Sequence, residues 1–108
     1  MSYKLRFLDR ALKEWEKLGA TLQTQFKKKF AERLKAPRVP GDALSGMPNH
    51  YKIKLRSAGY RLVYHVDDDT ITVMVIAIGK REHDEVYEVA KDRSGRFGFH
   101  EDPSDTYL

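Results

Sequence analysis

Two runs of alternating side chains, joined by a short turn, constrain the fold of this chain more than any other feature of its sequence. In residues 51–56 apolar or aromatic side chains alternate with basic ones, and in residues 60–66 Tyr60, Leu62, Tyr64 and Val66 alternate with Arg61, Val63 and His65. The segment between them, residues 57–59, reads Ser-Ala-Gly and is typical of a tight turn. After an acidic turn at residues 67–69, residues 71–78 are almost wholly apolar, as expected for a central strand. This pattern predicts an antiparallel meander of strands with short connections.

Residues 3–7 alternate in the same way and predict a half-buried strand near the N-terminus. A first helical pattern then begins at Asp9, its predicted N-cap, and stops at Gly19. A second begins at Thr21, again a predicted N-cap, and ends before Pro37. The apolar faces of the two helices are formed by Leu12, Trp15, Leu18, Leu22, Phe26, Phe30 and Leu34. Because only about two residues join these helices, we expect an antiparallel hairpin.

A short closing helix is predicted at residues 84–91. Residues 92–108 are polar, rich in Gly, Ser, Asp and Pro, and show no periodicity, which predicts a mobile tail. A chain of 108 residues has the size of one domain, so we assign residues 1–91 to a single folded domain and the rest to the tail. The order β-α-α-β-β-β-α predicts an α+β fold, in which the helical hairpin packs on a twisted antiparallel sheet.

The composition limits where the protein acts and what it binds. It contains no cysteine, so disulfides and thiolate chemistry are excluded and a reducing compartment fits. The N-terminus lacks the apolar run of a signal peptide, and no segment is apolar enough for a membrane helix. We therefore expect a cytoplasmic protein without membrane contact. The net charge is +4, with the positive excess in residues 1–91, which favours a polyanion or an acidic protein as partner.

The familiar catalytic and metal-binding motifs are absent from the sequence. His50, His65, His83 and His100 have no short ligand spacing and no cysteine to assist them, so a zinc site is not expected. The adjacent carboxylates of residues 67–69 are better explained as a solvated turn than as a metal site. No P-loop and no dinucleotide-binding glycine motif occurs. We therefore expect neither a metal nor a small-molecule cofactor.

Basic residues on the predicted strands are more informative. Lys52, Lys54 and Arg56 project from one face of their strand, because strand side chains alternate. Arg61 begins the neighbouring strand and can share that face, and Arg81 follows the last strand. Positive side chains gathered in this way repel each other and favour an anion among them. The alternative interpretation is an ordinary solvated face.

The second predicted helix carries a further group of bases, which includes Lys27, Lys28, Lys29 and Arg33. Its buried stripe is fixed by Phe26 and Phe30, so most of these bases are expected to point outward. Together with Arg56 they are candidates for RNA binding through phosphate contacts, which would add salt-sensitive affinity. A solvated helix face is again the alternative.

Three segments of the chain carry a resemblance to a known family. They read RALKEWEKLG, PGDALSGMPNHYKIKLRSAGYRLVYHV and VIAIGKREHDEVYE. They resemble the RelE toxins, the ribosome-dependent mRNA endonucleases of the RelBE toxin–antitoxin systems, and the similarity runs in continuous register over residues 3–91. The resemblance implies the RelE-like fold of small microbial RNases.

The resemblance also implies roles for individual residues. Lys52 and Lys54 match the two strand lysines of the family's active site, and Arg61 matches the arginine that stabilises charge on the scissile phosphate. Arg81 matches the proposed general acid, and Tyr87 matches the ring that stacks on or orients the substrate. The implied reaction is attack of a ribose 2′-OH on the adjacent phosphate of mRNA in the ribosomal A site, without a metal. It leaves a 2′,3′-cyclic phosphate and a 5′-OH. Because arginine hardly releases a proton, electrostatic stabilisation is the safer role for Arg81.

The implied partners are a RelB-like antitoxin, the ribosome with its 16S rRNA, and mRNA. Two other functions stay open on the same scaffold: a ParE-like toxin that poisons DNA gyrase, and an RNA- or ribosome-binding module that does not cut. The complete set of matched residues favours the endonuclease. One position departs from the family pattern, because Ser45 stands where relatives carry a basic residue. One RNA contact is therefore expected to be missing or supplied elsewhere.

Overall fold

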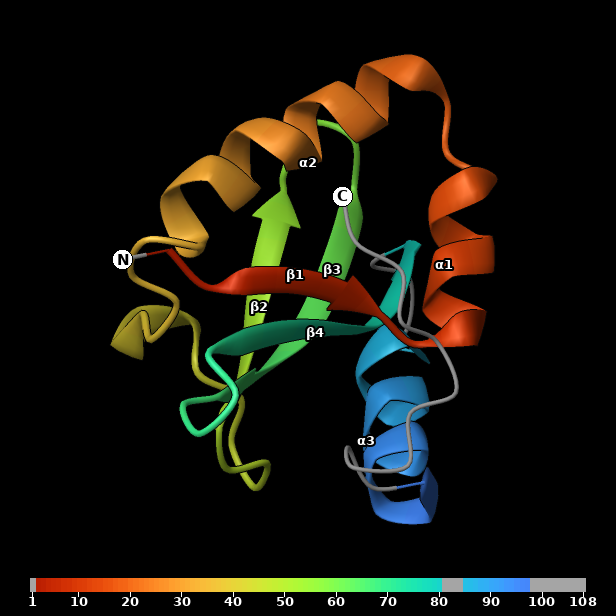
Figure 1. The fold of residues 1–108 in the computed structure, drawn as a ribbon. Helices are drawn as coiled ribbons and strands as arrows, with labels where there is room; N and C mark the ends of the chain where they lie inside the picture. The colour runs from red at the N-terminus through yellow and green to blue at the C-terminus, as the bar shows by residue number, and fades with distance from the viewer. Residues whose placement is uncertain (1, 81–84, 98–108) are drawn as a thin grey trace.

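The predicted meander is present in the structure, a computed structural model that describes residues 2–80 and 85–97. Its strands are β2 (His50–Leu55), β3 (Tyr60–Asp67) and β4 (Thr72–Lys80), each antiparallel to the next. A further strand, β1 (Lys4–Phe7), completes a sheet of order β1-β4-β3-β2. The helices are α1 (Asp9–Glu16), α2 (Ala20–Arg33), the short 3-10 helix η1 (Pro40–Asp42) and α3 (Glu85–Phe97) (Figure 1). The α+β class and the predicted order of the main elements are confirmed.

The sheet is mixed rather than wholly antiparallel as predicted, because β1 runs parallel to β4. In this pairing Leu5 lies opposite Val73 and Phe7 lies opposite Val75. Side chains alternate in the same way in parallel and antiparallel pairs, so the sequence pattern does not encode the direction of a strand. The direction of β1 follows from α1 and α2, which carry the chain across the sheet before β2 begins (Figure 1).

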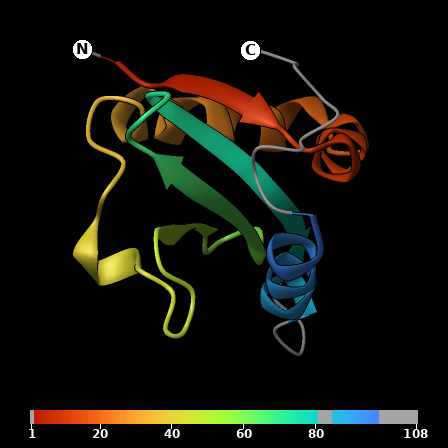
Figure 2. The same cartoon turned by 60° about the horizontal axis from the view of Figure 1, so that its bottom comes forward.

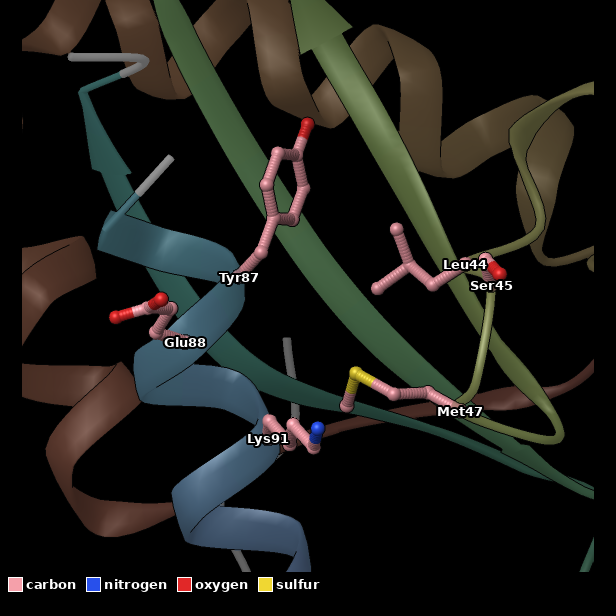
Figure 3. A pocket seen from close by; sticks show the side chains of 6 residues that line it. All are labelled: Leu44, Ser45, Met47, Tyr87, Glu88 and Lys91. Carbon is pink, nitrogen blue, oxygen red and sulfur yellow. The ribbon is translucent and has the colours of Figure 1, made fainter. Parts of the chain in front are cut away.

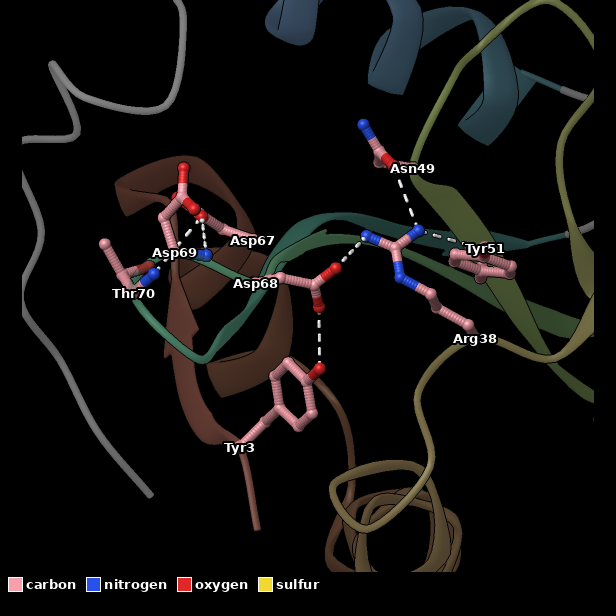
Figure 4. Close-up of polar contacts among 8 residues, drawn as sticks. All are labelled: Tyr3, Arg38, Asn49, Tyr51, Asp67, Asp68, Asp69 and Thr70. Atoms are coloured by element: carbon pink, nitrogen blue, oxygen red, sulfur yellow. Dashed lines mark hydrogen bonds and ion pairs between the residues drawn. The ribbon is translucent and has the colours of Figure 1, made fainter. Parts of the chain in front are cut away.

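The acidic run between β3 and β4 is a turn, as predicted. The Asp67 carboxylate accepts hydrogen bonds from two backbone N–H groups of the turn, at 2.9 and 3.3 Å (Figure 4). The neighbouring Asp68 forms an ion pair with Arg38 at 2.8 Å and accepts a hydrogen bond from the Tyr3 hydroxyl at 2.6 Å. These carboxylates therefore stabilise the turn and tie it to the segments that follow α2 and precede β1.

An aromatic cluster joins α1 and α2 to the sheet. Phe7 of β1 lies against Trp15 of α1, with ring centroids 5.5 Å apart, and against Phe30 of α2 at 6.4 Å. Phe26 is 6.2 Å from Trp15 and is fully buried. The predicted buried residues Trp15, Phe26 and Phe30 are therefore confirmed, and each ring adds a large apolar area to one core.

The two helices do not form the predicted antiparallel hairpin. They lie at a wide angle to each other (Figure 1, Figure 2) because Phe7 contacts both of them and each packs on the sheet. The predicted N-caps are also wrong: Leu8 caps α1 and Gly19 caps α2, neither with a side-chain hydrogen bond. Asp9 instead lies in the first turn of α1, where its carboxylate is favoured by the helix dipole.

The helices α2 and α3 cover opposite faces of the sheet. Neighbouring strand residues point to opposite faces, and Tyr64 and His65 show which helix lies on each. The Tyr64 hydroxyl accepts a hydrogen bond at 2.9 Å from Arg33 of α2. The His65 ring contacts His50, which is itself within 2.8 Å of the Ser94 hydroxyl of α3. Residues of β2 and β3, which pair without a register shift, can therefore be assigned to the α2 face or the α3 face by their position in the alternation.

The closing helix is longer than predicted. The sequence indicates a helix at residues 84–91, but α3 continues to Phe97, so the first residues of the predicted tail are helical. Residues 98–108, where the rest of that tail was predicted to be mobile, lie outside the described residues.

An ion pair between a buried arginine and a half-buried glutamate explains why the helix continues. Arg93 of α3 is 8% exposed and donates to both carboxylate oxygens of Glu14 in α1, at 2.9 and 3.0 Å. It also donates to the Ile76 carbonyl of β4 at 2.7 Å. Glu14 in turn accepts from the backbone N–H of Ile78 at 3.0 Å. This network fastens α3 to both α1 and β4.

Two histidines connect the sheet to α3. The rings of His50 and His65 have centroids 5.0 Å apart. His50 Nδ1 lies 2.8 Å from the Pro48 carbonyl, which can only accept, so Nδ1 carries the proton and the neutral Nε2 accepts from Ser94. Burial lowers the pKa of His50, and burial together with His50 lowers the pKa of His65 to about 4. Both rings are therefore neutral at pH 7.

We expect the free energy of unfolding to fall as the pH is lowered from about 7 towards 4. Because the folded pKa of His65 is about 4 and the unfolded value is near 6.5, the unfolded chain binds more protons in this window. Because the His65 ring is only partly buried, its contribution stays below the ~3 kcal/mol that the full pKa difference would give. Urea unfolding at a series of pH values measures it. A His50→Gln/His65→Gln double variant is the control, and an equally steep decline in that variant would contradict the assignment.

Candidate active site

Three of the predicted catalytic residues lie on the α3 face of the sheet. Lys52 and Lys54 share this face with His50, because alternate residues of β2 point the same way. Arg61 shares it with His65 on β3. In the register of the two strands, Lys54 lies directly opposite Arg61. The structure therefore brings Lys52, Lys54 and Arg61 together.

The closeness of these bases affects the protonation of Lys54. The ammonium group of Lys52 is the largest cause that lowers the pKa of Lys54 below its ordinary value. Partial burial lowers this pKa further, and the charges of Arg56 and Arg61 have smaller effects in the same direction. Asp42 opposes the shift. The Lys54 amine therefore reaches its free-base form at a lower pH than an isolated lysine does, which is the change that a general base requires.

Arg61 is held rigidly at this site. Its side chain is almost fully buried, with 6% of the residue exposed, and Nη1 donates to the Tyr60 carbonyl at 2.9 Å. An arginine keeps its charge under these conditions, and a charge away from bulk water acts more strongly on a nearby anion. Arg61 therefore offers a fixed positive charge beside Lys54.

A pocket of about 370 Å³ lies between α3 and the loop that precedes β2 (Figure 3). Its lining consists of Leu44, Ser45, Met47, Tyr87, Glu88 and Lys91. The Tyr87 ring projects from α3 over the strands, and Leu44 and Met47 face it from the loop (Figure 3). The pocket thus combines an aromatic ring and apolar walls, which are suited to a nucleic-acid base, with one lysine and one glutamate at its lining.

The predicted RNA-binding residues divide between two surfaces. Lys27, Lys28 and Lys29 are exposed on α2, which covers the face opposite Lys52 and Lys54. Arg56 is exposed just beyond the end of β2. The bases of α2 therefore do not extend the patch around Lys54 but form a second positive surface.

Arg33 differs from its prediction as an outward-pointing RNA contact. Only 14% of its side chain is exposed, and its guanidinium is bonded to the Asp42 carboxylate, the Tyr64 hydroxyl and the Lys52 carbonyl. Its donors therefore serve the protein itself. The prediction failed because Arg33 lies on the flank of α2 that faces β2, whereas the spacing of Phe26 and Phe30 indicates only the centre of the buried stripe.

One residue of the predicted catalytic set lies outside the described part of the chain, and two residues of the pocket were not predicted. Arg81 lies outside the described residues, so its position relative to Lys54 stays a prediction. Lys91 and Glu88 were not singled out from the sequence, although they line the pocket beside Tyr87. The signal was available for Lys91, because a position four residues beyond Tyr87 shares its side of a helix, whereas Glu88, one residue beyond, had no such signal.

The part of the chain that the structure describes holds no group of three or more His, Asp and Glu residues arranged to bind a metal ion. None of the helices in that part has the length and hydropathy to cross a membrane.

Comparison with known proteins identifies the family. Residues 5–85 match the family model of the ParE toxin of the type II toxin–antitoxin system parDE. The mRNA interferase toxin RelE of Escherichia coli K12 is 57% identical over 93 residues, which cover 86% of this chain and 98% of that protein. The mRNA interferase RelE of Shigella flexneri has the same identity and coverage.

Solved structures agree with the sequence comparison. An arginine-to-alanine mutant of E. coli RelE in the free state superposes with a TM-score of 0.80 at 56% identity, covering 86% of this chain and 98% of that one. RelE in the intact E. coli RelBE toxin–antitoxin complex gives a TM-score of 0.73 at 56% identity, covering 76% and 100%. This chain therefore belongs to the RelE branch of the RelE/ParE family of type II toxin–antitoxin toxins.

Proposed function

We propose that this protein is the toxin of a type II toxin–antitoxin pair and an endoribonuclease that cuts mRNA in the ribosomal A site. The observation that carries the proposal is the cross-strand pair of Lys54 and Arg61, with Lys52 on the same face. The similarity to E. coli RelE, named an mRNA interferase, over nearly the whole of that protein supports it. The cytoplasm, where translating ribosomes are found, is the proposed location.

The chemistry follows from the positions of these groups. Lys54 takes the proton of a ribose 2′-OH, and the resulting oxygen attacks the adjacent phosphorus while the bond to the 5′-oxygen breaks. Arg61 stabilises the charge that develops on the phosphate, and Arg81 is proposed to stabilise the leaving oxygen. The departing 5′-oxygen takes up a proton, so the products are a 2′,3′-cyclic phosphate and a 5′-OH. Tyr87 supports a base beside the reacting phosphate.

The remaining positive residues are proposed to bind RNA through phosphates. Lys27, Lys28 and Lys29 of α2 and Arg56 beyond β2 are exposed and available for such contacts. Because α2 lies on the other face of the sheet, its lysines are suited to rRNA of the ribosome rather than to the mRNA being cut. Contacts of this kind weaken as salt is raised.

A Lys54→Ala variant tests the assignment of the general base. Purified protein is added to stalled ribosomes with defined A-site codons, and primer extension maps the cut ends. We expect breaks with the wild-type protein and a rate at least about 100-fold lower with Lys54→Ala, the usual contribution of a general base. Lys4→Ala, which removes an exposed lysine from the far edge strand, should cut like the wild type. Full activity of Lys54→Ala would eliminate this role.

The same assay distinguishes mRNA cutting from the competing functions. Because the matching family model is that of the ParE toxin, a ParE-like gyrase poison is one competing function. Codon-spaced breaks in translated mRNA support cutting, whereas inhibition of DNA supercoiling by gyrase, without such breaks, would replace the proposal. Binding to ribosomes with neither effect would indicate a module that does not cut.

The pH dependence of cutting tests how Lys54 is tuned. Lys52 is the main cause of the lowered pKa of Lys54, so a Lys52→Met variant should raise that pKa. Since the free amine is the active form, the rising limb of the rate against pH should move to higher pH, with a lower rate near pH 7. Lys4→Met serves as the matched control and should leave the profile in place. An unshifted profile for Lys52→Met would show that Lys54 is not the group that titrates.

We further propose a RelB-like antitoxin as the partner that restrains this activity. E. coli RelE is solved in complex with RelB, and a net charge of +4 on this chain favours an acidic partner. The exposed Val89 on α3 gives that partner an apolar contact on a different side of the helix from Tyr87.

Expression of this protein alone should therefore arrest growth, and co-expression with a RelB-like antitoxin should restore growth and yield a complex that copurifies without cutting mRNA. Growth curves and pull-down from the co-expressing strain measure this outcome. The Lys54→Ala variant, which removes one charge from the site and leaves the residues of α3 unchanged, should bind the antitoxin without arresting growth. Unaffected growth with soluble, unpartnered wild-type protein would contradict the toxin assignment.

A further inference from the structure

Arg33 makes an unusual set of contacts for a residue at the end of a surface helix. One nitrogen, Nη1, donates to the Lys52 carbonyl at 3.0 Å and to the Tyr64 hydroxyl at 2.9 Å. The other, Nη2, is bonded to the Asp42 carboxylate. The guanidinium carbon lies 5.9 Å from the centre of the Tyr64 ring. A single charged group thus joins α2, η1, β2 and β3.

The contact with Lys52 falls on the outer edge of the sheet. β2 is the last strand in the sheet order, so half of its carbonyls point away from β3. The His50 carbonyl accepts from the Leu44 N–H at 3.0 Å on this edge, and the Lys52 carbonyl, two residues on, points the same way. Arg33 therefore binds the Lys52 carbonyl at the outer edge of β2, while the Lys52 side chain projects to the α3 face.

The contact with Asp42 connects Arg33 to the loop that lines the pocket opposite Tyr87. Asp42 is the last residue of η1, and the next residue, Ala43, bridges to Tyr51 of β2. The loop then continues through Leu44 and Met47, which line the pocket opposite Tyr87. The bond between Arg33 and Asp42 thus adds to the backbone contacts of Ala43 and Leu44 in holding this loop against β2.

We propose that Arg33 is a positioning residue for RNA cleavage, which sets the catalytic strand β2 and the pocket loop at residues 43–47 relative to each other. This inference rests on the proposed function and adds a residue to it. The fork of the guanidinium suits the task because it reaches a carbonyl, a hydroxyl and a carboxylate at once. A lysine at this place supplies only a point charge on a flexible stem.

The test compares Arg33→Gln and Arg33→Lys with the wild type in the stalled-ribosome assay. If Arg33 positions the site, both variants should lose about tenfold or more in kcat, because small displacements of catalytic groups are costly. The ribosome concentration at half-maximal rate should change by less than about twofold, since the exposed RNA-binding lysines are untouched. Asp42→Asn, which weakens the same bond from the other end, should lower kcat in the same direction.

Arg38→Gln is the matched control. Arg38 is also an arginine near the end of α2, but its bonds go to the side chains of Asp68 at 2.8 Å, Asn49 at 3.0 Å and Tyr51 at 3.4 Å, and none goes to η1 or to the backbone of β2. It should cut like the wild type. If Arg33→Lys cut at the wild-type rate and the cutting rate of Arg33→Gln depended less on salt, the proposal would be overturned. Such a result would indicate that the charge of Arg33 acts on RNA directly. Equal losses in Arg33→Gln and Arg38→Gln would overturn it as well.

A second readout keeps this inference separate from the proposed function. Amide hydrogen exchange of the pocket loop, residues 43–47, should be faster in Arg33→Gln than in Arg38→Gln, whatever the activity of either protein. Unchanged exchange in that segment would overturn the positioning role. A wild-type protein that cuts no mRNA on ribosomes would instead overturn the proposed function.

Discussion

The register between β2 and β3 is the constraint on which the candidate site depends. In this register Lys54 lies opposite Arg61, Tyr51 opposite Tyr64 and His50 opposite His65. A shift by one residue would turn the lysines towards α2 and the apolar side chains towards α3, because strand side chains alternate. The buried side chains of Ile53 and Leu62, paired on the α2 face, exclude such a shift energetically.

The fold holds together charges that would otherwise separate. Like charges directly opposite each other on a sheet are destabilising, so the pair of Lys54 and Arg61 costs free energy. The apolar core that contains Phe7, Trp15 and Phe30 offsets this cost at a distance from the site. Such an arrangement is typical of functional sites, where a locally unfavourable cluster is stabilised by the rest of the structure.

The helix α3 connects the site to the rest of the protein by contacts at its C-terminal half. Arg93 binds Glu14 and the Ile76 carbonyl, and Ser94 lies within 2.8 Å of His50. Tyr87, one to two turns earlier in the helix, has its position determined through these contacts. The C-terminal half of α3, where the sequence shows the weakest helical pattern, therefore supports the Tyr87 ring that lines the pocket.

The sequence alone determined the strands of the meander, the buried aromatic stripe of α2 and the face shared by Lys52 and Lys54, because alternation and helical periodicity are properties of neighbouring residues. The tertiary structure alone decided that β1 is parallel to β4, that Arg93 pairs with Glu14 and that Arg33 turns inward to Asp42. These features join residues far apart in the chain, and no local pattern records them. The physical reason is that a buried charge needs a partner, and only the packed fold determines which partner is within reach.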